Sequence, residues 1–301
     1  MRHALAIVMF GLAGLAVPAV PAAAQEWEKY EFSAQPLAEG LTWLRGPGGN
    51  VVACHGPDGV LLVDTDYEQM AEKLKGAVAV LGAGPVKFVV NTHWHFDHTG
   101  GNAALTRDGA SIIAHQNLRA RMEKGQTIAI IDETVAPSPA GALPRLTFTD
   151  SLMLHLNGEI IEIGHPRRAH TDGDAVLRFR RANVIHAGDL WFHGGYPFVD
   201  VSSGGDIDGL IAAIDVIIAA AGDSTRIVPG HGPVGTKVDL AAHRAMLQEF
   251  RDIVAREIVA GKDLATIIAE KPTARLDEVW GKRMFPPEAF TEMVYRSLKR
   301  D

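Results

Sequence analysis

The chain has 301 residues, a hydrophobic content of 47% and a formal net charge of −7. This composition is too apolar for a disordered chain and predicts a globular protein with a sizeable core. The acidic balance argues against nucleic acid as a partner, because phosphate binding needs clustered lysine and arginine side chains.

Residues 1–24 have the layout of a secretory signal peptide. Arg2 precedes an apolar run, and Ala22 and Ala24 supply the small side chains found before a cleavage site. We therefore predict a cut between Ala24 and Gln25 and a periplasmic or secreted mature protein. An uncleaved membrane anchor is the alternative, since the apolar run is almost long enough to span a bilayer. The prolines in the run favour cleavage, after which no stable membrane anchor is expected.

Residues 25–301 are predicted to form one domain, whose first half alternates strands with helices. Turns containing Gly and Pro separate apolar runs at 41–46, 50–56 and 59–66, which predicts an antiparallel meander. Apolar side chains then recur at helical spacing before a buried strand at 86–93. A strand, a helix and an irregular surface excursion complete this half at residues 110–116, 117–125 and 126–145.

The second half repeats this plan. Apolar runs with tight turns predict strands between residues 146 and 192, and a strongly apolar helix is expected at 206–223. A strand at 225–230 leads into a long amphipathic helix at 237–261. Two mixed β-sheets, each with helices on its outer face, predict a four-layer αββα sandwich of the α/β class.

The segment NTHWHFDHTGGN concentrates metal-binding side chains. His93, His95, Asp97 and His98 follow the end of an apolar strand. Residues two apart in extended backbone point the same way, so His93 and His95 can reach one metal, while a turn sends the other two towards a second. Imidazole and carboxylate are the zinc ligands available to a chain with a single cysteine. These positions predict metal binding.

Three later positions fit the same scheme. His170 lies in a loop between predicted strands, Asp189 directly after an apolar strand, and His231 on a glycine-flanked turn after another strand. Sites collect at such strand-end loops on layered α/β scaffolds. Gly100 and Gly101 are expected to let the chain turn tightly between the first cluster and the next helix.

The order of the motifs HWHFDH, AHTDGD, HAGD and PGHG resembles that of the metallo-β-lactamase superfamily. The resemblance spans nearly all of the chain after the signal, and it implies the αββα sandwich and a site for two Zn²⁺ ions. It assigns one ion to His93, His95 and His170, the second to Asp97, His98 and His231, and a bridging role to Asp189. It also implies that Asp64 orients metal ligands through hydrogen bonds. Iron or manganese could occupy a site with these ligands.

Such a centre predicts a metal-dependent hydrolase acting on a small molecule. Two zinc ions that share a water lower its pKa towards about 7, and the resulting hydroxide would attack a carbonyl. Asp97 is a candidate for proton transfer at the leaving group. The expected substrate is a β-lactam-like amide, a lactone or an ester, and the alternatives are a thioester, as in glyoxalase II, or a phosphodiester. The sequence indicates no oligomeric state.

The residues after the HAGD motif bear on the choice of substrate. The resemblance places a zinc-binding Cys of many β-lactamases at Asp189 and a carboxylate-binding Lys at Phe192, which weakens the β-lactam assignment. Export, in contrast, fits a β-lactamase-like role better than glyoxalase II, which is usually intracellular. His193, Trp191 and Tyr196 are candidate substrate contacts, with core packing as the alternative for the two aromatic residues.

Two alternatives belong to another class of function. One is a di-iron redox protein on the same fold, but oxygen- and nitric-oxide-reducing relatives typically replace the second loop histidine with Glu and carry a flavin domain. His95 and the absence of such a domain in the sequence argue against it. The other is a non-catalytic metal-binding relative, and the presence of all seven candidate ligands argues against that.

Overall fold

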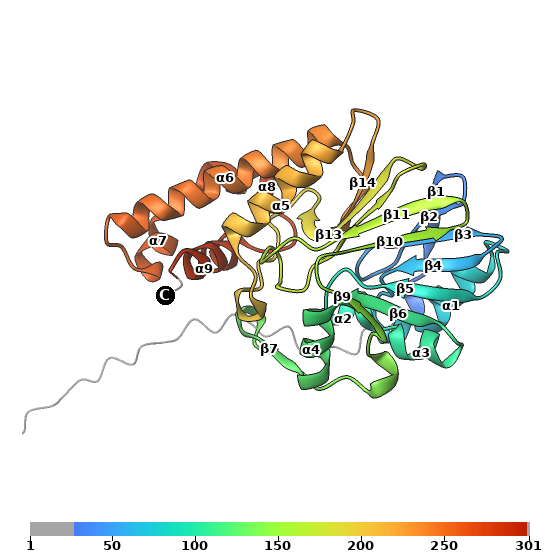
Figure 1. The fold of residues 1–301 in the computed structure, drawn as a ribbon. Coiled ribbons are helices and arrows are strands. Elements are labelled where there is room, and N and C mark those ends of the chain that lie inside the picture. Colours follow the sequence, from blue (N-terminus) through green and yellow to red (C-terminus); the bar gives the residue numbers. More distant parts are fainter. Residues whose placement is uncertain (1–26, 300–301) are drawn as a thin grey trace, which may run out of the picture.

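The computed structural model describes residues 27–299. The predicted signal peptide at 1–24 and the cut between Ala24 and Gln25 lie outside the described residues. Within them, the chain forms two large β-sheets packed face to face, with helices on both outer sides (Figure 1). In this part of the chain, no helix is both long enough and apolar enough to cross a bilayer.

The first sheet begins as an antiparallel meander and ends with parallel strands. Its strand order is β1-β2-β3-β4-β5-β6-β9, and the pairs from β4 to β9 are parallel. The strands are β1 Ser33–Ala38, β2 Leu41–Arg45, β3 Val51–Gly56, β4 Gly59–Val63, β5 Val86–Val90, β6 Ser111–His115 and β9 Leu146–Phe148. The sequence did not predict β1, because Pro36 weakens its strand pattern; proline is tolerated on an edge strand such as this one.

The second sheet has the order β10-β11-β12-β13-β14 and is antiparallel except for the β13–β14 pair. Its strands are β10 Ser151–Leu156, β11 Glu159–Gly164, β12 Val176–Phe179, β13 Val184–Phe192 and β14 Arg226–His231. β9 was expected among the strands of the second half. It pairs instead with β6, so it completes the first sheet.

Successive side chains of a strand point to opposite faces of its sheet, and in the first sheet both faces are buried. In β3, Val52 and Cys54 belong to the core between the two sheets, while Val51 and Ala53 pack in a second core. That second core includes Leu74 of α1 (Ala71–Ala79) and one side chain of α3 (Asn102–Arg107). The continuous apolar runs in the sequence therefore mark strands covered on each side.

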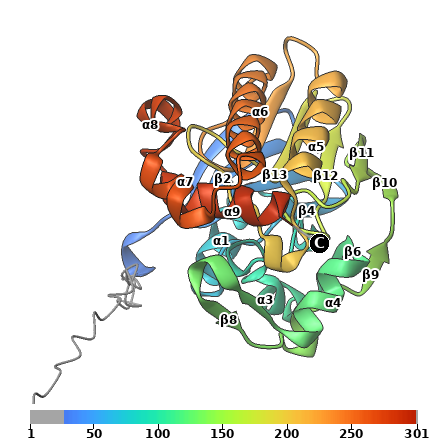
Figure 2. The same cartoon turned by 90° about the vertical axis from the view of Figure 1, so that its left-hand side faces the viewer.

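The remaining helices are distributed over both outer faces (Figure 2). The outer face of the second sheet packs in a third core against α5 (Ile207–Ala220), α6 (Lys237–Val259) and α9 (Pro287–Leu298). The shorter helices are α2 Phe96–Thr99, α4 Gln116–Lys124, α7 Leu264–Glu270 and α8 Ala274–Trp280. The excursion at 126–145 contains a small hairpin, β7 Gln126–Ile128 and β8 Glu133–Val135. These layers confirm the predicted αββα sandwich.

Candidate metal centre

The first group of predicted ligands lies where the chain leaves β5 and enters α2. His95 is the residue before α2, and Asp97 and His98 occupy its first turn. The two glycines that follow have ordinary helical or near-helical φ values, so a strained turn is not their role. A Cβ at Gly100 would collide with the backbone of Glu68, and one at Gly101 would lie 2.7 Å from the carbonyl oxygen of Thr65. The glycines are needed because neighbouring backbone passes so close.

The other predicted ligands reach the same place from the second sheet. His170 lies in the loop between β11 and β12, and His231 is the last residue of β14. Asp189 lies inside β13 and not after its end, and it follows Gly188, whose φ is +54°. The pairing of β13 with β14 shifts register at Gly188, which is a local irregularity of the strand. A Cβ at Gly230 would collide with the Asp189 carboxylate, so this glycine leaves room for it.

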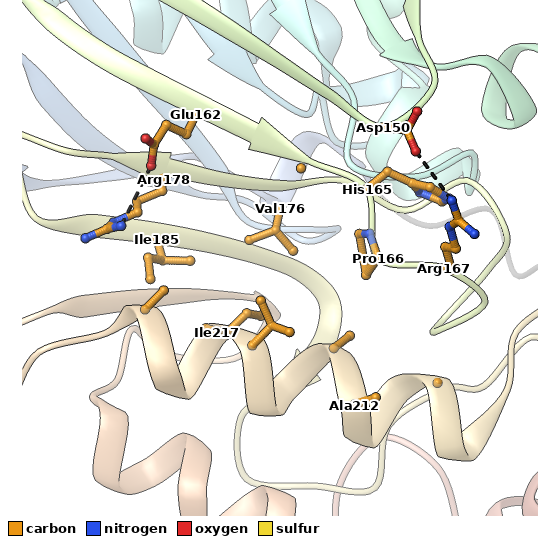
Figure 3. Close-up of a pocket in the computed structure, with 15 residues that line it drawn as sticks. Asp150, Glu162, His165, Pro166, Arg167, Val176, Arg178, Ile185, Ala212 and Ile217 are labelled. Carbon is orange, nitrogen blue, oxygen red and sulfur yellow. Dashed lines mark ion pairs between the residues drawn. The ribbon is translucent and has the colours of Figure 1, made fainter.

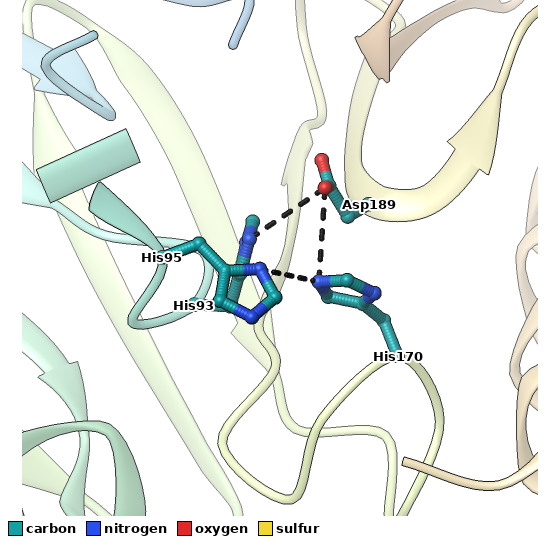
Figure 4. Close-up of side chains that lie close together, drawn as sticks. All are labelled: His93, His95, His170 and Asp189. Carbon is teal, nitrogen blue, oxygen red and sulfur yellow. Dashed lines mark hydrogen bonds and ion pairs between the residues drawn. The ribbon is translucent and has the colours of Figure 1, made fainter. Parts of the chain in front are cut away.

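The seven predicted ligands converge in two adjoining groups. His93, His95, His170 and Asp189 form one group and Asp97, His98 and His231 the other; within each, potential ligand atoms lie within 4.8 Å of one another. Figure 4 shows the side chains of the first group pointing towards one another. Asp189 joins the groups: its Oδ2 is 3.6 Å from His93 Nε2 and 3.4 Å from His231 Nε2. Its Oδ1 is 3.2 Å from His98 Nε2.

The unpaired atoms of this cluster fit metal ions. His95 Nδ1 lies 3.0 Å from His170 Nε2, and His98 Nε2 lies 3.3 Å from His231 Nε2. In each pair, only one imidazole nitrogen could donate to the other. His93 Nε2 is buried and has no hydrogen-bond partner among the described residues. Buried polar groups are normally satisfied, so imidazole nitrogens placed this close together, with one left without a partner, indicate a site for cations.

Each of four histidines is fixed through its other nitrogen. His93 Nδ1 is 3.0 Å from Thr92 Oγ1, and His170 Nδ1 is 2.8 Å from the carbonyl oxygen of Phe198. The remaining two contact buried carboxylates: His98 Nδ1 is 2.8 Å from Asp64 Oδ2, and His95 Nε2 is 3.1 Å from Asp200 Oδ2. These contacts select Nδ1 of His95, and Nε2 of the other three, as the metal-facing atoms.

Of the two carboxylates that contact ligand histidines, Asp64 was predicted from the sequence and Asp200 was not. Asp64 was singled out by its place in a family motif, and it also accepts hydrogen bonds from the backbone and hydroxyl of Thr92. Asp200 was missed. Its Oδ1 accepts from Ser202 Oγ and from the backbone N–H of Ser203. No local pattern around Asp200 indicates a site, because its partner His95 lies 105 residues earlier in the chain.

Burial and charge set the protonation of the cluster. Burial lowers the pKa of His93, and it lowers that of His170 to about 4, so both rings are neutral and can offer a lone pair. Burial alone would raise the pKa of Asp97, but the charges of His98 and His231 hold it at about 2. Burial opposes protonation of His98, yet nearby carboxylates raise its pKa. The cluster thus attracts positive charge, which a divalent cation would supply.

The three candidate substrate contacts are His193, Trp191 and Tyr196, and they are not metal ligands. Trp191 and Tyr196 are fully buried in the core of the second sheet, and the Tyr196 hydroxyl donates to Asp277. Their burial corresponds to the core-packing alternative. The His193 ring stacks on Trp191, with Nδ1 2.8 Å from the carbonyl oxygen of Pro233. None of these three side chains is in either ligand group.

A separate groove of about 500 Å³ lies between α5 and the second sheet (Figure 3). Val176, Ile185 and Ile217 line it, and Arg167 at its rim pairs with Asp150. No residue of the metal cluster is among its lining residues, so this groove is distinct from the candidate metal centre.

A model of the metallo-β-lactamase superfamily matches residues 44–254. The chain belongs to this superfamily. Among curated relatives, the hydroxyacylglutathione hydrolase of Polaromonas sp. is 29% identical over 218 residues, which cover 67% of this chain and 71% of the relative. The type 2 metallo-β-lactamase of Bacteroides fragilis is 24% identical over 199 residues, covering 66% of this chain and 74% of the relative. The chain is accordingly a metal-dependent hydrolase, as predicted.

Solved structures show the same fold. The metallo-β-lactamase from Pontibacter korlensis aligns with a TM-score of 0.59 at 20% identity, covering 72% of this chain and 99% of that one. A stereoselective inverting sec-alkylsulfatase from Pseudomonas sp. aligns with a TM-score of 0.68 at 17% identity, covering 88% of this chain and 50% of that one. These likenesses support the sandwich architecture.

Proposed function

We propose that this superfamily member is an exported dinuclear zinc hydrolase that cleaves a carbonyl substrate, either an ester or a lactone. The observation that carries the proposal is the pair of ligand groups joined by Asp189. Three imidazoles and a shared carboxylate suit one zinc ion, and two imidazoles with Asp97 and the same carboxylate suit the other. A bound pair of ions would supply Lewis acidity, which polarises a carbonyl and acidifies water.

The residues of the chain would bind the ions, orient them and move a proton. Four of the histidines are held in fixed tautomers by contacts with Asp64, Asp200, Thr92 and the Phe198 carbonyl. The histidine rings therefore need little rearrangement when metal binds. The Asp97 side chain is 15% exposed, which places its carboxylate where it can meet a substrate. We assign to Asp97 a proton relay, in which its ionised carboxylate accepts a proton from the attacking water and delivers it to the leaving group.

Phe192 favours an ester or lactone over a β-lactam. Its ring stacks on His231 with centroids 4.9 Å apart, at the position where the family resemblance expects a carboxylate-binding lysine. An apolar ring there offers no charge to the carboxylate of a β-lactam antibiotic. The similarity to hydroxyacylglutathione hydrolase keeps a thioester as the second candidate substrate; a phosphodiester is less favoured.

Metal analysis and a substrate panel test the function. We expect two zinc ions per chain by mass spectrometry, loss of hydrolysis on chelation, and recovery with added zinc. The panel comprises nitrocefin, a carbapenem, a lactone, an aryl ester, a thioester and a bis-aryl phosphodiester. Less than one zinc per chain, with no hydrolysis restored by zinc, would refute the proposal. Faster turnover of nitrocefin or the carbapenem than of the ester and lactone would refute the preferred substrate class.

Export is tested on the protein made in a bacterial host with a periplasm. We expect the mature protein in the periplasm or medium, with a mass that corresponds to a start at Gln25. A mass that retains residues 1–24 would contradict the proposed cleavage.

A further inference from the structure

The metal cluster is open to solvent on one side only. His93, His95, His98, His170 and Asp189 are each at most 4% exposed. Asp97 and His231 differ, with side chains that are 15% and 17% exposed. A substrate must therefore approach past these two residues.

Aromatic side chains border this open side. Phe96, next to Asp97 in the chain, is 38% exposed and lies 5.9 Å from the Tyr67 ring. On the other flank, Phe192 stacks on His231, and Phe285 lies 6.3 Å from Phe192 between ring centroids. Aromatic rings therefore lie next to both of the partly exposed ligands, Asp97 and His231.

Phe285 is the outermost ring of its flank. Phe192 and Phe198 are 3% and 5% exposed, whereas Phe285 is only partly buried and stacks on Phe198 at 5.1 Å. Phe198 in turn stacks on the ring of His95 at 5.4 Å. Through these contacts, Phe285 stands next to residues that touch ligands of both groups.

The segment that carries Phe285 lies beyond residues 44–254, the region matched by the superfamily. It follows α8 and is attached to the core where Met284 pairs with Tyr196 in an isolated β-bridge. The Tyr196 backbone N–H also donates to the carbonyl oxygen of Trp280. A part of the chain outside the shared family region thus contacts residues that pack on the metal ligands, and such a segment can set specificity without altering the ligands.

We propose that Phe285 is a specificity-determining residue that selects substrates with a bulky, uncharged, apolar acyl group. This inference rests on the proposed hydrolysis of a carbonyl substrate. The acyl chain would pack on the Phe285 ring, which neighbours Phe192 and Phe198, while the reacting carbonyl lies at the metal ligands. Contacts of this kind discriminate between substrates because each methylene buried against an apolar wall contributes to transition-state binding.

The test compares p-nitrophenyl acetate with p-nitrophenyl octanoate on the zinc-loaded protein. We expect the wild type to prefer octanoate in kcat/KM, and Phe285→Ala to lower the octanoate-to-acetate ratio about 10-fold, within the range for lost apolar contacts. Phe285→Leu, which keeps an apolar side chain, should retain most of the preference. Lys282→Ala is the matched control, because Lys282 is an exposed residue of the same segment. Calorimetric binding of octanoate and acetate gives a second readout that does not depend on turnover.

The outcomes separate the two proposals. If the wild type hydrolyses the esters but the ratio of Phe285→Ala stays within twofold of wild type, with unchanged zinc content and melting temperature, the role of Phe285 is refuted alone. An equal fall in Lys282→Ala also refutes it. If the zinc-loaded wild type hydrolyses none of the panel substrates or these esters, the proposed function fails, and the inference fails with it.

Discussion

Replacing Asp200 by asparagine is expected to weaken metal binding without unfolding the protein. Asp200 is 1% exposed and uses its two oxygens for different partners: Oδ2 faces His95 Nε2 at 3.1 Å, and Oδ1 accepts from Ser203 N–H at 3.1 Å. Burial would raise the pKa of Asp200, but the contact with His95 holds it below its usual range, so the group is an anion.

Asparagine has one acceptor oxygen in place of two. In Asp200→Asn it can accept from His95 or from Ser203, and its NH₂ group then faces the other N–H donor. The tautomer with Nδ1 of His95 towards the metal is no longer enforced. Loss of such an orienting partner typically weakens metal affinity by about 10- to 100-fold, or about 1.4–2.7 kcal/mol.

Competition between the protein and a zinc chelator of known affinity measures this change. Cobalt substitution adds a spectrum that reports on the ligand geometry of His95. Ser202→Ala is the matched control, because Ser202 donates to Oδ1 of Asp200 and not to Oδ2, the oxygen that faces His95. Zinc affinity within twofold of wild type in Asp200→Asn, with an unchanged metal-free melting temperature, would refute the argument. So would an equal loss in Ser202→Ala, because the effect would then not pass through His95.

Three further changes test other parts of the structure. Asp189→Ala is expected to lower zinc content to one ion per chain or less by mass spectrometry, because both of its oxygens face the ligand groups; two retained ions would contradict this. Gly230→Ala should also lower zinc content, since the added methyl collides with the Asp189 carboxylate, whereas Gly222→Ala, whose methyl meets only Thr225 Oγ1 at 3.8 Å, should not. His243 is fully buried and its ring has no hydrogen-bond partner within residues 27–299, and burial lowers its pKa from 6.5 to about 3. Because the unfolded chain then binds a proton that the folded one refuses, stability falls as pH drops from about 6.5 towards 3, by about 2 kcal/mol between pH 7 and pH 5. Denaturant unfolding at both pH values should show that the free energy of unfolding of His243→Leu falls by about 2 kcal/mol less than that of the wild type between pH 7 and pH 5.

Several ligands could be predicted from sequence because they follow or end an apolar strand. A strand that is buried on both faces reads as a continuous apolar run, so a histidine or aspartate at its end stands out, as His93 does after β5 and His231 at the end of β14. A continuous apolar run also gives no indication of which face of the sheet each side chain of the strand points towards. All nine residues of β13 are buried, so no alternation distinguished Asp189, which faces the metal ligands, from Trp191 in the core.

Contacts between distant segments set the rest of the centre. Asp200 can orient His95 only after the loop that follows β13 has folded against the start of α2, because this brings the Asp200 carboxylate to the His95 ring. Phe285 reaches Phe192 only because the segment after α8 folds back onto the loop that follows β13, where Met284 pairs with Tyr196. A lone aspartate and a lone phenylalanine carry no spacing signal in sequence. The metal ligands can therefore be predicted from short sequence motifs. The residues that orient the ligands, and those that surround the substrate, are brought together only by the tertiary fold. For this reason, variants at Asp200 and Phe285 should separate metal affinity from substrate choice, and a variant at one position that changed both would show that the two are coupled.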